Sequence, residues 1–314
     1  MNYLSPAALV AASPAPYVIP AEVPPAVLPA APRAPEVRTE QTWWQEAARR
    51  PVLAAAVGFV VLLVAAALLP GLLTAVDPQA ADPARAFLQP TWTNPLGTDE
   101  NGRDVLARIV HGAGASLGLG VLTMAISLGL GVVVGLWGGL GGRLSDGTAM
   151  RFADVMAAIP NVLFALLVIA LWGQSTINVI LAIGIATMPR YARLVRTQAR
   201  TIRHAAFIEA ATSLGQRRST IVWRHILPNA VRPALLLGVI GIGDKIAFAA
   251  TLSFLGFGSP PPAPEWGAML ATGRNYVSVA PWLVVAPAVT ITLTVLAVTA
   301  LGREIIRRSE GRAA

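Results

Sequence analysis

Long uncharged stretches dominate the pattern of the chain. Five stretches run for 25 residues or more with no Asp, Glu, Lys or Arg, except for one adjacent pair, Asp244 and Lys245. A transmembrane helix needs about 20 mostly apolar residues. The stretch 155–189 is long enough for two helices, with a turn at Trp172–Ser175. We therefore predict an all-α membrane protein with six transmembrane helices, at residues 52–74, 116–138, 155–172, 176–194, 232–256 and 281–302.

The ends of the chain have a different composition. Residues 1–45 contain nine Pro among many Ala without hydrophobic periodicity, which predicts a disordered tail. The remainder divides into a first span with the loop that follows it (46–112), a helical transmembrane domain (113–303) and a short basic tail (304–314).

Composition excludes several classes of protein. Only 13% of the 314 residues are charged and 55% are hydrophobic, whereas soluble domains carry about 25% charged residues. The absence of Cys excludes disulfides, thiolate metal sites and a cysteine nucleophile. The three histidines, His111, His204 and His225, lack metal-ligand spacing, so we expect neither a metal nor a cofactor.

The net charge of +8 comes mainly from arginine, and its distribution predicts an orientation. With both termini in the cytoplasm, 19 of the 23 Arg fall in cytoplasmic segments and four in outer segments. Arginine marks the cytoplasmic side of membrane proteins. We do not predict nucleic-acid binding, because the basic loop lies between membrane spans and has few aromatic residues to stack on bases.

Glycines in the second predicted span have helical spacing. Gly131, Gly135 and Gly139 repeat every four residues and so share one helix face. Small residues with this spacing let helix backbones approach closely. We favour packing within the chain over dimerisation with a second copy.

The loop between the fourth and fifth spans is the most informative segment. Residues 190–232 contain nine Arg and a single acid, Glu209. The pattern predicts a helix at Thr201–Leu214 that stops at Gly215, and a second helix at Ser219–Ile226 that ends before Pro228. Two short helices with a Gly corner would project as a compact knob towards a partner.

The residues of this knob resemble a known motif. Glu209-Ala210-Ala211, then Gly215, then Leu227-Pro228 resembles the "EAA" loop of permease subunits in bacterial ABC importers. The resemblance implies a type I ABC importer transmembrane domain, with this loop as the coupling helix that docks on the ATP-hydrolysing subunit. Glu209 sits among cations and apolar residues, so we expect it to hold the loop helices together or to meet a basic group on that subunit. One position departs from the consensus, since His225 stands where the family has Ile.

Other stretches narrow the resemblance to the dipeptide/oligopeptide/nickel permeases. They are the segment 94–106 (NPLGTDENGRDVL), the segment 252–258 (LSFLGFG) with 265–270 (EWGAML), and the segment 224–229 (RHILPN). The likeness extends over about residues 50–303 and points to the second of two permease subunits. Ala249, Thr299 and Arg303 stand where that subfamily usually carries Asp, Glu or Asn, which leaves the substrate open.

Asp244 and Lys245 are charges in the middle of a predicted span. A charge at the bilayer centre costs about 2.5–3.5 kcal/mol on insertion scales. Neighbours on a helix point about 100° apart, so the two do not simply pair with each other. They either line a translocation path for a zwitterionic solute or form an interhelical charge pair. Asp154 is expected at the membrane interface near Arg151.

The resemblance implies an ATP-driven importer of short peptides in the bacterial inner membrane. Its expected partners, besides membrane lipid, are a homologous second permease, two ABC ATPase subunits and an extracytoplasmic solute-binding protein. The chain is not expected to be an enzyme, because it has no Gly-Lys-Ser/Thr phosphate loop. Import of nickel or another small solute remains open, and an ion-coupled secondary transporter is the alternative from another class.

Overall fold

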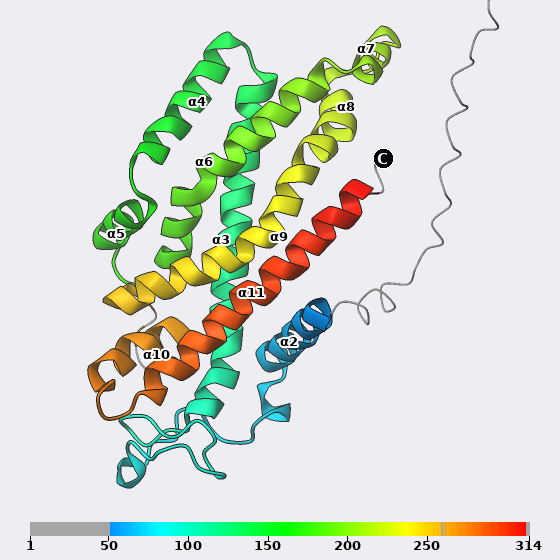
Figure 1. Ribbon diagram of the computed structural model, residues 1–314. Coiled ribbons are helices and arrows are strands. Elements are labelled where there is room, and N and C mark those ends of the chain that lie inside the picture. The colour runs from blue at the N-terminus through cyan, green and yellow to red at the C-terminus, as the bar shows by residue number, and fades with distance from the viewer. Residues whose placement is uncertain (1–50, 259, 261, 312–314) are drawn as a thin grey trace, which may run out of the picture. The chain divides into compact units, whose positions relative to one another are not determined.

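The computed structural model describes residues 51–258, 260 and 262–311, which include a series of packed helices (Figure 1). The predicted tail 1–45 lies outside the described residues. The longer helices are α2 (Pro51–Leu68), α3 (Val105–Leu140), α4 (Arg143–Ala158), α5 (Asn161–Trp172), α6 (Thr176–Arg203), α9 (Leu227–Leu252) and α11 (Trp282–Gly311). The shorter ones are η1 (Pro70–Leu72), η2 (Pro83–Arg85), α7 (Ala206–Ser213), α8 (Arg218–Ile221), η3 (Val222–Ile226), η4 (Ser253–Phe257), α10 (Trp266–Gly273) and η5 (Arg274–Tyr276).

Helix α3 is the central element, and α2, α4, α6, α9, α10 and α11 all contact it. It begins at Val105 because the Asp104 side chain accepts a hydrogen bond from the Ala107 amide at 2.7 Å. The helix begins before the predicted span 116–138 and contains all of it. Arg108, in its first turn, has a buried guanidinium that lies 3.6 Å from the Asp99 carboxylate.

The glycine face of α3 packs against α6, so the prediction of packing within the chain is confirmed. A Cβ at Gly131 would lie 2.5 Å from Tyr191 Cβ, and one at Gly135 would lie 2.6 Å from the Ala192 carbonyl oxygen. A Cβ at Gly139 would lie 2.8 Å from Ala199 Cβ. Only glycine lets the two helices approach this closely.

The third predicted span, 155–172, is not one helix. Helices α4 and α5 meet at Ile159–Pro160 and are bent by 92°. Proline disfavours the helical region for the residue before it, and Ile159 is accordingly extended (φ −86°, ψ 127°). The apolar stretch therefore forms a broken span.

Helix α9 belongs to a longer helical run, Arg218–Phe257, which includes α8 and two π-type turns. The prediction that a helix ends before Pro228 is wrong. The π turn at Val222–Ile226 leads directly into α9, and Pro228 lies in the first turn of α9. The π turn directly before Pro228 departs from the α-helical hydrogen-bond pattern, and the proline, which has no N–H to donate, follows this irregular turn.

Four described helical runs are long and apolar enough to cross a membrane: Pro51–Leu68, Val105–Leu140, Arg218–Phe257 and Trp282–Ser309. A fifth is added if the bent α4–α5 pair counts as one span. The all-α membrane fold is thus confirmed, whereas the count of six is not. Helix α6 falls outside these runs, since arginines occupy its second half.

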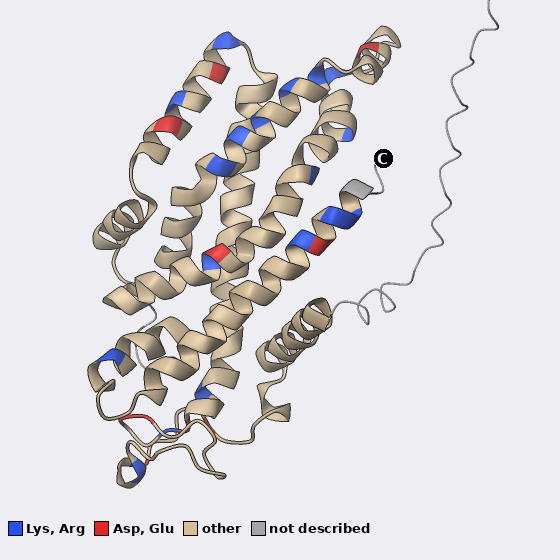
Figure 2. Cartoon of the chain, in the orientation of Figure 1, with Lys and Arg blue, Asp and Glu red and all other residues tan. Residues whose placement is uncertain are grey.

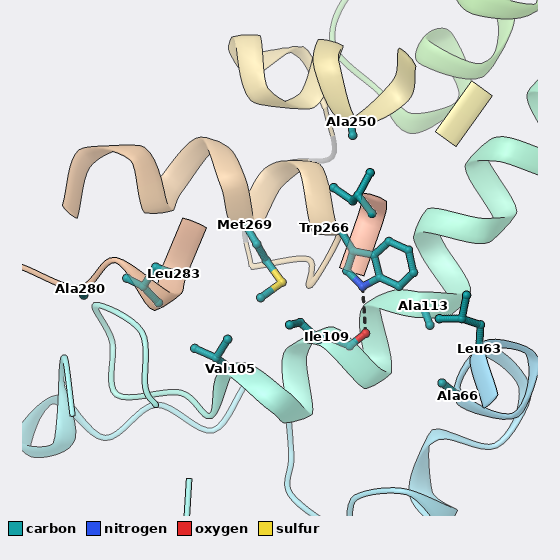
Figure 3. Close-up of a cluster of buried hydrophobic side chains, with 11 residues drawn as sticks. Leu63, Ala66, Val105, Ile109, Ala113, Ala250, Trp266, Met269, Ala280 and Leu283 are labelled. Carbon is teal, nitrogen blue, oxygen red and sulfur yellow. Dashed lines mark hydrogen bonds between the residues drawn. The ribbon is translucent and has the colours of Figure 1, made fainter. Parts of the chain in front are cut away.

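One hydrophobic cluster fixes the end of the bundle that carries α10 (Figure 3). Trp266 lies at its centre, fully buried among residues of α2, α3, α9 and α11. Its indole N–H donates to the Ile109 carbonyl at 2.9 Å. Glu265, just before it, is buried and caps α10 by accepting from the amides of Gly267 and Ala268; burial raises the pKa of this carboxyl.

Candidate coupling loop and translocation path

The chain leaves α6 at Arg203 and turns at His204–Ala205 before α7 begins. The predicted single helix Thr201–Leu214 is therefore wrong, because the backbone of Ala205 is extended (φ −77°, ψ 144°). His204 closes the end of α6 with a 2.9 Å hydrogen bond between its Nδ1 and the Arg200 carbonyl. We call the segment from Ala206 to Leu227 the coupling loop.

Gly215 ends α7 as predicted. Its φ of +75° lies in the left-handed region that favours glycine. The Gln216 amide donates to the Ala211 carbonyl at 3.1 Å, and the Gly215 amide donates to the Thr212 carbonyl at 3.0 Å. These two bonds define a Schellman motif, which satisfies the last carbonyls of the helix.

The inner face of the coupling loop is apolar. Ile208 and Ala211 of α7 are buried in one cluster with residues of α6, η3 and α9, namely Ala199, Ile226 and Ala230. Ala211 is small enough to let α7 lie against these helices. The coupling loop is thus joined to two long helices by packed side chains.

The outer face carries the other residues of the Glu-Ala-Ala motif. Glu209, Ala210 and Gly215 are exposed, as is Pro228, while Leu227 is half-buried. Within the described residues the Glu209 carboxylate has no hydrogen-bond or ion-pair partner. It therefore does not hold the loop helices together in this chain.

The coupling loop also exposes large apolar residues, which sequence reasoning missed. Phe207 and Leu214 of this loop are 50% and 81% exposed, and Trp223 is 69% exposed. Positions 207, 210 and 214 share one side of a helix, about 100° around from the buried 208 and 211, and this spacing is the signal that could have found two of the three. His225, the departure from the motif, lies beside Phe207 with ring centroids 6.5 Å apart and contacts Gln216 Oε1 at 3.2 Å.

The structure separates Asp244 from Lys245. The Asp244 side chain is 58% exposed and lies 3.7 Å from Arg190 Nη1 on α6. Lys245 is buried, with its Nζ 5.8 Å from the centroid of the Tyr191 ring. The prediction that the two do not pair with each other is confirmed, and Arg190 is the partner that the sequence did not reveal.

Arg190 belongs to an exposed face of α6 that runs towards α7. Its members, at helical spacing, are Arg190, Arg193, Thr197 and Arg200, and Figure 2 shows basic residues along this helix. Arg193 Nη2 donates to Asp154 Oδ1 at 2.9 Å, which gives Asp154 a partner that the sequence did not reveal. Arg151 precedes Asp154 by about one turn of α4, in agreement with the expectation that the two lie near each other. The opposite face of α6 packs on the glycines of α3, so the arginine side chains lie on the side of α6 that faces away from α3.

A compact loop region, residues 77–104, lies at the α10 end. Asn94 Nδ2 donates to Asp104 Oδ2 at 2.6 Å, and Arg85 Nη2 donates to Asn94 Oδ1 at 2.5 Å. Trp92 is fully exposed on this loop region. Within the described residues no three His, Asp or Glu side chains come close enough together to hold a metal ion.

Comparison with known proteins identifies the family. The family model described as "Binding-protein-dependent transport system inner membrane component" matches residues 131–311. The glutathione transport system permease protein GsiD of Pectobacterium atrosepticum is 38% identical over 268 residues, covering 85% of this chain and 89% of that protein. The dipeptide transport system permease protein DppC of Alkalihalophilus pseudofirmus is 36% identical over 250 residues, covering 79% and 82%.

Solved structures share the fold at low sequence identity. A chain of the MetNI methionine ABC transporter, in an inward-facing conformation, aligns with a TM-score of 0.52 and 18% identity, covering 65% of this chain and 96% of that one. A chain of an amino acid ABC transporter solved with histidines aligns with a TM-score of 0.51 and 17% identity, covering 65% and 94%. With the family model matching more than half of its residues, this chain belongs to the inner-membrane permeases of binding-protein-dependent transport systems.

Proposed function

We propose that this chain is the second permease subunit of an ATP-driven importer of short peptides. The observation that carries the proposal is its identity of 35–38% to permeases of glutathione, dipeptide and di/tripeptide transport systems over most of both chains. The coupling loop, with its buried apolar face and exposed Glu209, supports the same assignment.

The coupling loop is the docking site for an ABC ATPase subunit. Phe207, Leu214 and Trp223 supply apolar area, and Glu209 supplies a charge without a partner in the described part of the chain. Buried aromatic anchors contribute much of the energy of protein interfaces. ATP is hydrolysed in the partner subunits, two per transporter, because this chain has no phosphate-binding Gly-Lys-Ser/Thr motif.

The α7 end of the bundle faces the cytoplasm, as do both termini, and the α10 end faces the solute-binding protein. The distribution of arginine supports this orientation. The loop region 77–104, with its exposed Trp92, is then part of the surface on which a solute-binding protein delivers substrate.

The translocation path runs along the exposed face of α6 and past the Arg190–Asp244 pair. Charges in the middle of a membrane protein face a water-filled path or another subunit, because lipid contact is costly. A homologous second permease completes the path opposite these residues. Arg190 can bind a peptide's carboxylate and Asp244 its ammonium group, whereas the buried Lys245 keeps α9 positioned against Tyr191.

The test is uptake of a labelled dipeptide into proteoliposomes that contain the chain with its neighbouring gene products. Uptake is expected to require ATP on the α7 side and a solute-binding protein on the other. Uptake driven by an ion gradient without ATP would contradict the proposal and favour a secondary transporter. If a nickel chelate competed for uptake and peptides did not, the substrate would be a nickel chelate and not a peptide.

A further inference from the structure

A basic cavity lies at the α7 end of the bundle, at the corner between α3 and α4. Its volume is about 360 Å³, and it is lined by the glycine turn Gly141–Gly142 and by Arg143, Arg200, Arg203 and His204. These residues come from two segments about 60 positions apart, which the close packing of Gly139 on Ala199 brings together. We call it the corner cavity.

The cations of the corner cavity are poorly compensated. None of its lining residues is acidic. Asp146, outside the cavity lining, accepts hydrogen bonds from Nε and Nη2 of Arg196 and forms an ion pair with Arg200 Nη1 at 3.4 Å, which leaves Arg143 and Arg203 without a carboxylate partner in the described part of the chain. The side chains of Arg143, Arg200 and Arg203 are exposed at this cavity, so an anion that enters it would meet three cations and no lining acid.

The remaining contacts of these side chains are weak. Arg203 Nη1 lies 3.4 Å and 3.5 Å from the carbonyl oxygens of Leu140 and Gly141, at the outer limit of hydrogen bonding. Arg143 has no side-chain partner within the described residues. His204 bonds the Arg200 carbonyl through Nδ1 and keeps Nε2 available. These side chains therefore have N–H groups that could donate hydrogen bonds to an anion in the cavity.

The backbone adds to this positive character. Helix α4 starts at Arg143, and its N-cap Gly142 provides no side-chain acceptor for the first amides. The Ser145 hydroxyl donates to the Gly142 carbonyl instead of capping these amides. An anion in the corner cavity would meet the positive end of the α4 dipole as well as the arginines.

We propose that the corner cavity binds a phosphate group, carried by an anionic lipid headgroup or by a soluble phosphate compound. Guanidinium groups match phosphate with paired hydrogen bonds, and basic pockets between membrane helices bind lipid headgroups. Trp137 and Leu144 at the same corner are 50% and 85% exposed. Tryptophan favours the membrane interface, and an exposed leucine adds apolar surface, so this corner suits a lipid source.

The experiment uses the assembled transporter in nanodiscs of phosphatidylcholine alone, without peptide substrate. One arm adds phosphatidylglycerol to the disc, and the other adds inorganic phosphate to the buffer. The Tm of the wild-type transporter is expected to rise by roughly 2–5 °C in one of the two arms. Native mass spectrometry then measures how much lipid stays bound to the transporter. A gain in the first arm only assigns a lipid headgroup, and a gain in the second assigns a soluble phosphate.

Two variants and one control make the result specific. Arg143→Gln with Arg203→Gln removes donors and should lose the gain in Tm. Gly142→Asp, at an extended position with open space around it, caps α4 with a carboxylate and should also lose the gain while the protein stays folded. Arg151→Gln, on an exposed part of α4 outside the cavity, should keep it.

The proposal is overturned if wild type gains stability in neither arm, or if Gly142→Asp gains as much as wild type. Because no peptide is present, either result leaves the proposed import of peptides untouched.

Discussion

Arg190 on α6 and Asp244 on α9 hold their charges 3.7 Å apart, and more than half of each side chain is exposed. The pair joins two helices that a sequence pattern treats as separate spans. An exposed ion pair contributes only about 0–1 kcal/mol to stability, so we propose that the pair serves transport, and the alternative, a role in packing, predicts a different outcome for the variant below.

Asp244→Asn should therefore reduce peptide uptake about tenfold, which corresponds to about 1.4 kcal/mol, without lowering the amount of assembled transporter. The reason is loss of the carboxylate that binds the peptide's ammonium group. Uptake of a labelled dipeptide and co-purification of the subunits measure the two effects. Asp244→Glu, which keeps the charge, should retain most uptake. A loss of assembly with Asp244→Asn would assign the pair to packing instead.

Gly215→Val should abolish transport. A β-branched residue at φ +75° is strained by about 1–3 kcal/mol, and this strain would displace the end of α7. Because a Cβ at this position meets no atom within 4 Å, the effect is one of backbone conformation and not of crowding. Gly215→Asn, which tolerates the left-handed region, is the matched variant and should keep transport. Equal uptake by both variants would show that the turn is not needed.

Glu209→Lys should release the ATPase subunits while leaving the stability of the permease unchanged. The carboxylate has no partner in the described part of this chain, so the fold loses nothing when it is replaced. The measurement is the amount of ATPase retained on the purified permease, alongside its Tm. A fall in Tm together with full ATPase retention would contradict a role in docking.

Gly135→Ala should destabilise the bundle by about 1–3 kcal/mol. The new Cβ would lie 2.6 Å from the Ala192 carbonyl and 2.8 Å from Val195 Cβ, so α3 and α6 must move apart. Gly129→Ala on the same helix meets nothing within 4 Å and should be neutral or slightly stabilising. Thermal unfolding of both variants in detergent tests the difference, and equal Tm values would refute close packing of this face.

Single cysteines test the orientation on a background that has none. A cysteine at Gln89, exposed in the α10-end loop region, should react with a membrane-impermeant thiol reagent in intact cells. A cysteine at Ala313 should react only after the cells are opened. The reverse pattern would invert the proposed topology.

The helical membrane fold, the close contact at the α3 glycines and the turn at Gly215 could be predicted from the sequence, because each depends on the spacing of residues that are near one another in the chain. It could not locate the break at His204–Ala205, where neither Gly nor Pro signals the end of a helix. It also missed the Arg190–Asp244 pair, because the two residues are 54 positions apart and meet only through the packing of α6 on α9. Helix α3 begins before the predicted span 116–138, and Arg108 in its first turn lies against Asp99.

The continuous helical run Arg218–Phe257 has a mechanical consequence. Its 40 residues have a length along the helix axis of at most about 60 Å at 1.5 Å per residue, and they lead from the coupling loop to the vicinity of the Trp266 cluster, where Ala250 is packed. The run has π turns near both ends, and at Gly256 the backbone leaves the helical region (φ +92°). A displacement of the coupling loop would therefore reach the opposite end of the bundle through a single helical element, and these irregular turns are the places where the element could bend.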